Sequence, residues 1–265
     1  MVYCNLKGGL GNMMFQIAAT KSIAIDNDTD CSFPNLDSHL NYLNQETTYN
    51  PKLKHSFEYR DLFKNLKKTP INCRKILTYP FEYVNIKLPK SDIIIDGFFQ
   101  SEKYFVHNRE MIIDYMKPPQ KVFNTIQEKY KEHLKNKTTS IHVRRGDYVA
   151  HQSHHPTQTL DYYNEAVNTV KDKTELFLIF SDDIKWCKDN LKIKNSVYIE
   201  NEKDYIELYL MSLCDNNIIS NSSFSWWGAW LNNNRNKIVV GPKRWFGPAI
   251  KHDTSDILPE SWIKL

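Results

Sequence analysis

Short apolar runs alternate with amphipathic stretches through the second half of this chain, and this alternation restricts the fold more than any other feature. The runs at 140–143, 176–180, 197–199, 217–220 and 238–240 predict strands, and the stretches at 160–170, 184–190, 202–213 and 224–231 predict helices. Strands that need not alternate in polarity are typical of parallel sheets covered by helices on both faces. The pattern therefore predicts an α/β fold whose second half is a Rossmann-like, doubly wound sheet.

The first half follows the same plan with a weaker signal. Strands are expected at 2–6 and 92–96, and helices at 13–19, at about 104–115 and at about 122–134. The region 28–88 is rich in Asn, Pro, Tyr and Lys, which predicts loops and short helices. The polar break Lys135-Asn136-Lys137 is the expected boundary between an N-terminal half, 1–135, and a C-terminal half, 136–265.

Composition excludes several classes of protein. With 41% hydrophobic and 25% charged residues, the 265-residue chain can build a core and is not intrinsically disordered. The net charge of +4 and the pI near 8.6 are too mild for a basic nucleic-acid domain. Five scattered cysteines with no Cys-x-x-Cys pair favour a reducing compartment. Because no export signal and no apolar run of about 20 residues is visible, we expect a cytoplasmic protein without a transmembrane segment.

The glycines are unevenly placed. Only 8 occur in the chain, and Gly8, Gly9 and Gly11 lie together between the first strand and the first helix. Backbone N–H groups at such a turn, followed by a helix N-terminus, could bind an anion together with Asn12. Met14 stands where the third glycine of a dinucleotide fingerprint would fall, so a purely structural tight turn is an equal alternative.

A pair of arginines follows the strand at 140–143. Alternation along the strand places His142 and Arg144 on one face, and Val143 and Arg145 on the other. The planar fork of arginine suits phosphate oxygens, so we expect Arg144 to contact a ligand. For Arg145, ligand contact and a structural ion pair with Asp147 or Asp182 are equal alternatives.

Two further polar loops follow strands. Ser181-Asp182-Asp183 could hold a metal, read a guanine edge or cap the next helix, and Asn221, Ser222 and Ser223 could bind phosphate or form an ordinary helix cap. Trp226, Trp227 and Trp230 at one-turn spacing predict core packing, with sugar stacking as the alternative. Ligands of such sheets bind at the carboxyl ends of the strands, so these loops are expected to share one edge.

Four ordered motifs now resemble one family. They are Lys7-Gly8-Gly9-Leu10-Gly11-Asn12 with Phe15-Gln16, the run His142 to Tyr148, the run Phe180 to Asp183, and the run Ser220 to Leu231. Together they resemble the α-1,2-fucosyltransferases of glycosyltransferase family 11 and span residues 3–231. Met13 is a departure, because the family usually has Gln there.

The resemblance implies a GT-B fold, with two Rossmann-like halves facing across a cleft. It also implies an inverting reaction without metal or other cofactor, with GDP-fucose as donor and a terminal β-galactoside as acceptor. Arg144 would hold the β-phosphate, and His142 with Asp182 or Asp183 would contact guanosine. Ser222 and Ser223 would bind phosphate, while Gly11 and Asn12 would approach from the N-terminal half, which would take the acceptor.

A base is also needed, because the attacking hydroxyl must lose a proton, and Asp147 is the candidate. The expected activity is transfer of L-fucose to O2 of galactose in a cell-surface or secreted glycan, with acceptor contacts from 28–88. The mild positive charge would favour an anionic membrane surface, where a lipid-linked acceptor could lie at the inner face. The alternatives are a GDP-sugar transferase with another donor or linkage and a non-catalytic glycan-binding protein, with a nucleic-acid binder as a distant third.

Overall fold

The computed structural model describes residues 1–44 and 59–265, which form two compact units. The first unit comprises Met1–Pro119 and His252–Pro259, and the second comprises Gln120–Lys251 and Glu260–Leu265. The division therefore falls earlier than the expected boundary at residue 135, and a late segment returns to the first unit. Both units are built on parallel sheets, as the α/β prediction requires.

Specific contacts explain why the division differs from the expected one. Helix α5 (Gln120–Tyr130) belongs to the second unit because Lys129 and Tyr130 both contact the Glu202 carboxylate, at 2.6 and 2.9 Å. The late segment belongs to the first unit because His252 stacks on Phe81 with ring centroids 4.8 Å apart. Such long-range contacts have no local sequence signal.

The first unit contains a four-stranded parallel sheet in the order β2-β1-β4-β3. Its strands are β1 (Val2–Cys4), β2 (Cys31–Ser32), β3 (Ile76–Thr78) and β4 (Ile93–Asp96). Its helices are α1 (Leu10–Asp26), α2 (Leu36–Leu43), α3 (Tyr59–Leu62) and α4 (Arg109–Tyr115), with short 3-10 turns at Glu102–Tyr104 and Val106–Asn108. The prediction of loops and short helices over 28–88 was incomplete, since β2 and β3 lie there.

The second unit contains a six-stranded parallel sheet in the order β10-β9-β8-β5-β6-β7. Its strands are β5 (Thr138–Val143), β6 (Leu176–Ser181), β7 (Ser196–Tyr198), β8 (Asn216–Ile218), β9 (Val239–Gly241) and β10 (Ile263–Lys264). Besides α5, its helices are α6 (Leu160–Val170), α7 (Ile184–Asn190), α8 (Asp204–Ser212) and α9 (Ser223–Leu231). Short 3-10 turns lie at His133–Lys135, Asp147–Val149 and Lys171–Lys173.

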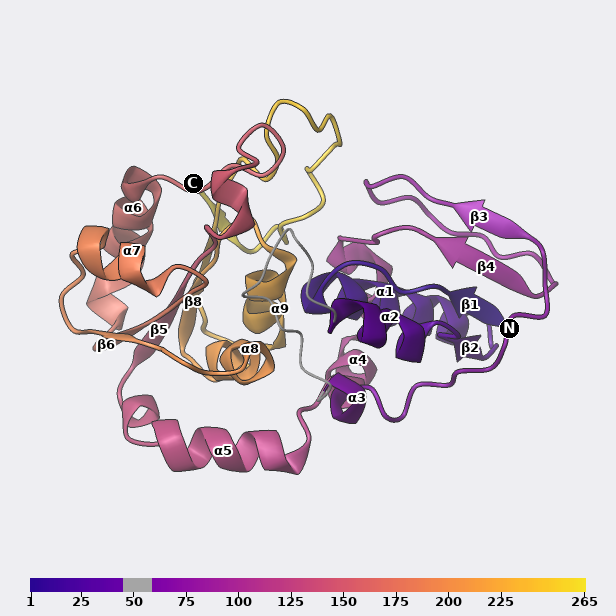
Figure 1. Cartoon of the computed structure of the whole chain (residues 1–265), viewed down its shortest axis with the longest axis horizontal. Coiled ribbons are helices and arrows are strands. Elements are labelled where there is room, and N and C mark those ends of the chain that lie inside the picture. Colours follow the sequence, from indigo (N-terminus) through magenta and orange to yellow (C-terminus); the bar gives the residue numbers. More distant parts are fainter. Residues whose placement is uncertain (45–58) are drawn as a thin grey trace. The chain divides into compact units, whose positions relative to one another are not determined.

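Helices cover both faces of this sheet (Figure 1). On one face, Ile141 and Val143 of β5 pack in a buried cluster with Tyr163 of α6 and Cys187 of α7. On the other, α8 packs on α9, whose tryptophans Trp226, Trp227 and Trp230 are at most 1% exposed. The prediction that these tryptophans form core is confirmed, and they are not available to stack on a sugar. The sheet is thus held rigid beneath the loops at its carboxyl edge.

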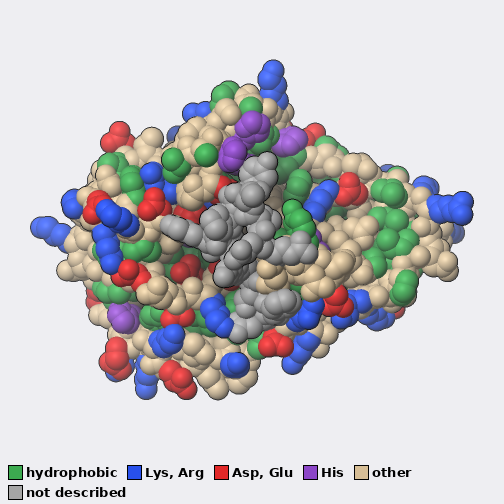
Figure 2. Space-filling view, in the orientation of Figure 1, with side chains coloured by type: hydrophobic (Ala, Val, Ile, Leu, Met, Phe, Trp, Pro, Cys, Tyr) green, Lys and Arg blue, Asp and Glu red, His purple; other side chains and the backbone are tan. Residues whose placement is uncertain are grey.

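Two further observations bear on the kind of surface this fold presents. Lys and Arg side chains are interspersed with Asp and Glu over the face shown in Figure 2, with no single-sign stripe visible there. In the part of the chain that the structure describes, no helix has the length and apolar character needed to cross a membrane.

Candidate active site

Strand β5 positions the paired arginines by its alternation. Val143 points into the core between the sheet and α6, whereas His142 points to the other face, where its ring lies 5.4 Å from that of Phe224. His142 Nδ1 lies 2.8 Å from Ser220 Oγ, so two strand-end loops meet at this ring. Burial, and to a smaller degree the positive charge of Arg144, lower the pKa of His142 to about 3. The imidazole is therefore neutral near pH 7.

Arg144 lies between two carboxylates. Its Nη2 donates to Asp147 Oδ1 at 2.6 Å, and its Nη1 lies 3.0 Å from Asp182 Oδ2. Burial alone would lower the pKa of Arg144, but the charges of Asp182 and Asp147 outweigh it and raise that pKa. The guanidinium is thus a permanent, oriented cation at the carboxyl edge of the sheet.

Arg145 has a different set of partners. Its Nε lies 3.2 Å from Asp183 Oδ2, and its guanidinium stacks on the Trp186 ring at 4.0 Å. Asp183 also caps α7, because its Oδ1 accepts the Trp186 N–H at 3.2 Å. The ion-pair alternative for Arg145 is therefore present, with Asp183 as its partner instead of Asp147 or Asp182. Both side chains, predicted to bind substrate, hold the β6–α7 turn.

Asp182 fixes the loop that carries both arginines. Its Oδ1 accepts the backbone N–H of Arg145 at 2.8 Å. A Cβ placed on Gly146 would stand 2.5 Å from Asp182 Oδ2, so any other residue here would displace the Asp182 carboxylate. Asp182, which follows β6, thus joins its own loop to the loop after β5. Its predicted role in binding guanosine stays a prediction.

The loop between β8 and α9 contains a buried asparagine that binds several other segments. Asn221 is 2% exposed, and both of its amide hydrogens are used, by the carbonyls of Pro156 and Trp245, each at 2.9 Å. Its Oδ1 accepts from Gln158 Nε2 at 2.9 Å. We therefore assign the Asn221 side chain, predicted to bind substrate, to loop architecture.

The start of α9 offers backbone donors. The first bond into the helix runs from the Trp226 N–H to the Ser222 carbonyl at 3.0 Å. The preceding N–H groups, those of Ser223, Phe224 and Ser225, come before that bond and are the donors that a helix N-terminus leaves for an anion. Ser222 and Ser223 stand where the prediction needs them, and their contact with phosphate stays a prediction.

In the first unit, the glycine turn opens α1. Gly8 has φ +77, a conformation that favours glycine, and a Cβ there would stand 2.5 Å from Asn12 Nδ2. The Gly8 carbonyl contacts His39 Nε2 at 2.8 Å, and Asn12 Oδ1 accepts from Gln100 Nε2 at 2.7 Å. His39 and Gln100 were not expected to take part in the turn.

The donors of this turn belong to the helix start. The first bond into α1 runs from the Met13 N–H to the Gly9 carbonyl at 3.0 Å, so the preceding N–H groups, including that of Gly11, come before it. Gly9 and Asn12 are partly exposed, while Gly11 is buried. The predicted donor contacts of Gly9, Gly11 and Asn12 stay predictions.

Sequence patterns missed Glu207 in the first turn of α8. This side chain is partly buried, and the structure gives its carboxylate no hydrogen bond or ion pair within the described residues. Burial, reinforced by the charges of Asp204, Glu202 and Asp182, raises the pKa of Glu207 well above its usual range. A carboxyl group with a raised pKa and no protein partner, at the carboxyl edge of a parallel sheet, is a candidate binding group. No local motif marks it, because the desolvation arises from tertiary packing.

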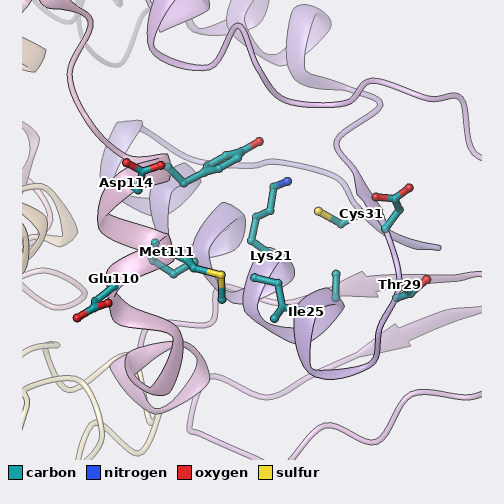
Figure 3. Close-up of a pocket in the computed structure, with 11 residues that line it drawn as sticks. Lys21, Ile25, Thr29, Cys31, Glu110, Met111 and Asp114 are labelled. Carbon is teal, nitrogen blue, oxygen red and sulfur yellow. The ribbon is translucent and has the colours of Figure 1, made fainter.

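Other places in the described chain are less suited to a site. Residues 1–44 and 59–265 contain no group of three or more His, Cys, Asp or Glu side chains that could hold a metal. A hollow of about 530 Å³ lies between α1 and α4, next to the segment Thr29–Cys31 that leads into β2 (Figure 3). Its lining includes Asp30, Glu110 and Asp114 against one Lys21, which disfavours an anionic ligand.

Two units built on parallel sheets and helices are the architecture of the GT-B class of glycosyltransferases. The fold is shared by the fucosyltransferase NodZ from Bradyrhizobium, with a TM-score of 0.53 at 13% identity, covering 86% of this chain and 92% of that one. It is also shared by POFUT1 in a structure with GDP, with a TM-score of 0.51 at 12% identity, covering 89% of this chain and 95% of that one.

The family follows from the sequence. The model described as glycosyl transferase family 11 matches residues 1–265, and the chain belongs to this family. Among its relatives, an O-antigen biosynthesis glycosyltransferase, WbnK, from Escherichia coli is 33% identical over the whole of both chains. An alpha-1,2-colitosyltransferase from Escherichia coli is 29% identical over 100% of this chain and 99% of its own. A galactoside 2-alpha-L-fucosyltransferase from Caenorhabditis elegans is 27% identical over 65% of this chain and 53% of its own.

Proposed function

We propose that this family 11 glycosyltransferase moves L-fucose from GDP-fucose to O2 of a terminal β-galactoside in a cell-surface or secreted glycan. The observation that carries the proposal is Arg144. It is a fixed cation held by Asp147 and Asp182, on the same sheet edge as the free N–H groups that open α9. Binding and releasing a nucleoside diphosphate requires such a cation and such N–H donors close together.

The chemistry places charge on the diphosphate. When the bond between the anomeric carbon and the phosphate oxygen breaks, negative charge grows on GDP, and oriented donors lower the barrier if they stand there before the reaction. A guanidinium has five N–H donors, and its two carboxylate partners leave others for phosphate oxygens. Arg144 and the start of α9 supply this stabilisation in the proposal, without a metal ion.

The proposal also assigns the base of the nucleotide. Guanine presents neighbouring N–H donors, which a carboxylate accepts well. Asp182 is paired with Arg144 and Arg145, and Asp183 with Arg145 and the Trp186 N–H. The carboxylate of Glu207 has no such partner among the described residues. We therefore assign guanine to Glu207, and we keep the neutral His142 ring as a proposed contact of guanosine.

Asp147 is the proposed general base. It is the carboxylate on the Arg144 loop with about a third of its side chain exposed, so it can reach a bound acceptor. It would accept the proton of the acceptor hydroxyl as that oxygen attacks the anomeric carbon. The ion pair with Arg144 would hold the carboxylate in place until then.

The linkage and the donor rest on different support. Two relatives carry an α-1,2 or 2-alpha linkage in their names, which supports transfer to O2. The colitosyltransferase is similar over nearly the whole length of both chains, and this favours a colitosyl donor as the second candidate. The proposal further places the protein in the cytoplasm at the inner face of the membrane, in keeping with its unpaired cysteines and mild positive charge.

Replacement of Arg144 tests the function. Arg144→Ala should lower transfer by about 10²–10³-fold and weaken GDP binding, because one preorganised donor and a full charge are lost. Arg144→Lys should keep the charge but lose the fork, with an intermediate result. Arg235→Ala, an exposed arginine of the same unit, is the control and should behave as wild type. Normal turnover in Arg144→Ala would refute the assignment.

A further inference from the structure

Tyr148 connects the two loops that carry the proposed phosphate donors. It lies in the 3-10 turn Asp147–Val149, and its ring faces the Arg144 guanidinium at 5.3 Å. Its hydroxyl donates to the carbonyl of Asn221 at 3.2 Å. That carbonyl belongs to the peptide that leads into Ser222, so one side chain touches the cation and the loop that begins α9.

The Tyr148 ring also packs against a second ring. The His155 ring stacks on it with centroids 5.0 Å apart and planes at 23°, and Phe246 meets His155 edge-on at 5.6 Å. The Gly247 N–H donates to the His154 carbonyl at 2.8 Å, which joins the two loops behind the stack. With both Arg144 and His155 packed against it, the Tyr148 ring has little freedom to rotate.

We infer that Tyr148 is a positioning residue. It holds the Arg144 side chain and the start of α9 at a fixed distance from each other, so that both contact the same diphosphate. The inference rests on the proposed function and adds a residue to it. Arginine loses considerable rotamer entropy when it binds, and a side chain already fixed against a ring loses less. Burial raises the pKa of Tyr148 to about 12, so its hydroxyl remains a donor to Asn221.

The test separates the ring from the hydroxyl. Tyr148→Phe keeps the ring and removes the bond to Asn221, whereas Tyr148→Leu removes both contacts. Tyr198→Phe is the matched control, because Tyr198 OH donates to the Leu191 carbonyl at the same 3.2 Å, directly after the end of α7. The dissociation constant of GDP is measured by calorimetry for each variant, together with KM for donor and acceptor, kcat and the melting temperature.

We expect Tyr148→Phe to raise the GDP dissociation constant and the donor KM about fivefold, from one lost hydrogen bond. Tyr148→Leu should raise both about tenfold or more, because the contact with the guanidinium is lost as well. The acceptor KM should not change. In an Arg144→Lys background, Tyr148→Leu should have a smaller effect, since Tyr148 acts through the guanidinium.

Each outcome has one interpretation. If wild type binds GDP and both Tyr148 variants bind it within twofold of wild type, the inference is wrong and the proposed function stands. If their melting temperatures fall while GDP affinity is kept, Tyr148 is only structural, and the inference is wrong. If wild type itself does not bind GDP, the proposed function fails first.

Discussion

At the scale of single residues, Glu207 stands out because burial makes ionisation of its carboxyl group unfavourable. The pKa of Glu207 is raised in the folded protein, so the folded state holds this proton more strongly than the unfolded chain. Below pH 4 both states are protonated and the group has no effect. As pH rises, the unfolded state ionises first, and stability falls toward neutral pH.

Glu207→Gln should therefore stabilise the protein at pH 7 and have little effect at pH 4, as measured by urea unfolding at both values. If Glu207 accepts guanine N–H donors, the same variant should bind GDP about tenfold more weakly, from a lost charge-assisted hydrogen bond. Glu165→Gln, an exposed glutamate of α6, is the control. If the variant is more stable but binds GDP normally, Glu207 has no role in binding guanine.

The role of Asp147 as general base can be tested separately from nucleotide binding. Asp147→Asn should lower kcat by about 10²-fold or more, because the proton of the acceptor hydroxyl loses its acceptor. GDP affinity should change far less than in Arg144→Ala, since the guanidinium keeps Asp182 as a partner. Single-turnover kinetics and calorimetry measure the two effects. If kcat stays within threefold of wild type, the base is another group or none.

At the scale of elements, local patterns predicted the second unit well. Helices α6 and α7 begin and end where the amphipathic pattern places them, because their apolar stripes face one continuous core. The strands β2, β3 and β10 escaped prediction, since two or three residues carry no periodicity. Their pairing depends on neighbours far away in the chain.

Polar residues were harder to interpret than apolar ones. The cluster from Asn232 to Asn236 predicts a solvated turn, yet Asn232 is 2% exposed and donates to the Cys214 carbonyl and to Asn217 Oδ1. Asn221 and Asp183 likewise lie at the expected edge, but their side chains bind other parts of the protein. Asn221 donates to the Pro156 carbonyl, and Asp183 caps α7 and pairs with Arg145. A sequence shows which polar residues follow a strand, but their partners come from tertiary packing.

The Asn221 hub gives a prediction for the loops as a group. Asn221→Ala leaves two buried carbonyls without donors and should cost about 1–3 kcal/mol in unfolding free energy. Hydrogen exchange should rise in the segments around Pro156 and Trp245, and GDP affinity should fall with it. Asn190→Ala, which removes one exposed bond on α7, is the control. Unchanged exchange around Pro156 would show that other contacts hold these loops.

At the scale of the whole molecule, two α/β units and the family 11 match define a fucosyltransferase-like glycosyltransferase. The identity of the sugar donor is the part of the function that an experiment must supply. The family resemblance contributed the donor and the linkage, which no strand or loop pattern could have supplied. The structure contributed the distinction between side chains that hold the loops and those left for a ligand.

The most direct measurement is product analysis with the whole protein. The protein is incubated with GDP-fucose and a panel of β-galactosides, with excess chelator in a parallel reaction, and the product linkage is determined. The account predicts α-linked fucose on O2 of galactose, one GDP released for each fucose transferred, and the same rate with chelator. Transfer from another GDP-sugar in preference to GDP-fucose, or to another hydroxyl, would contradict it.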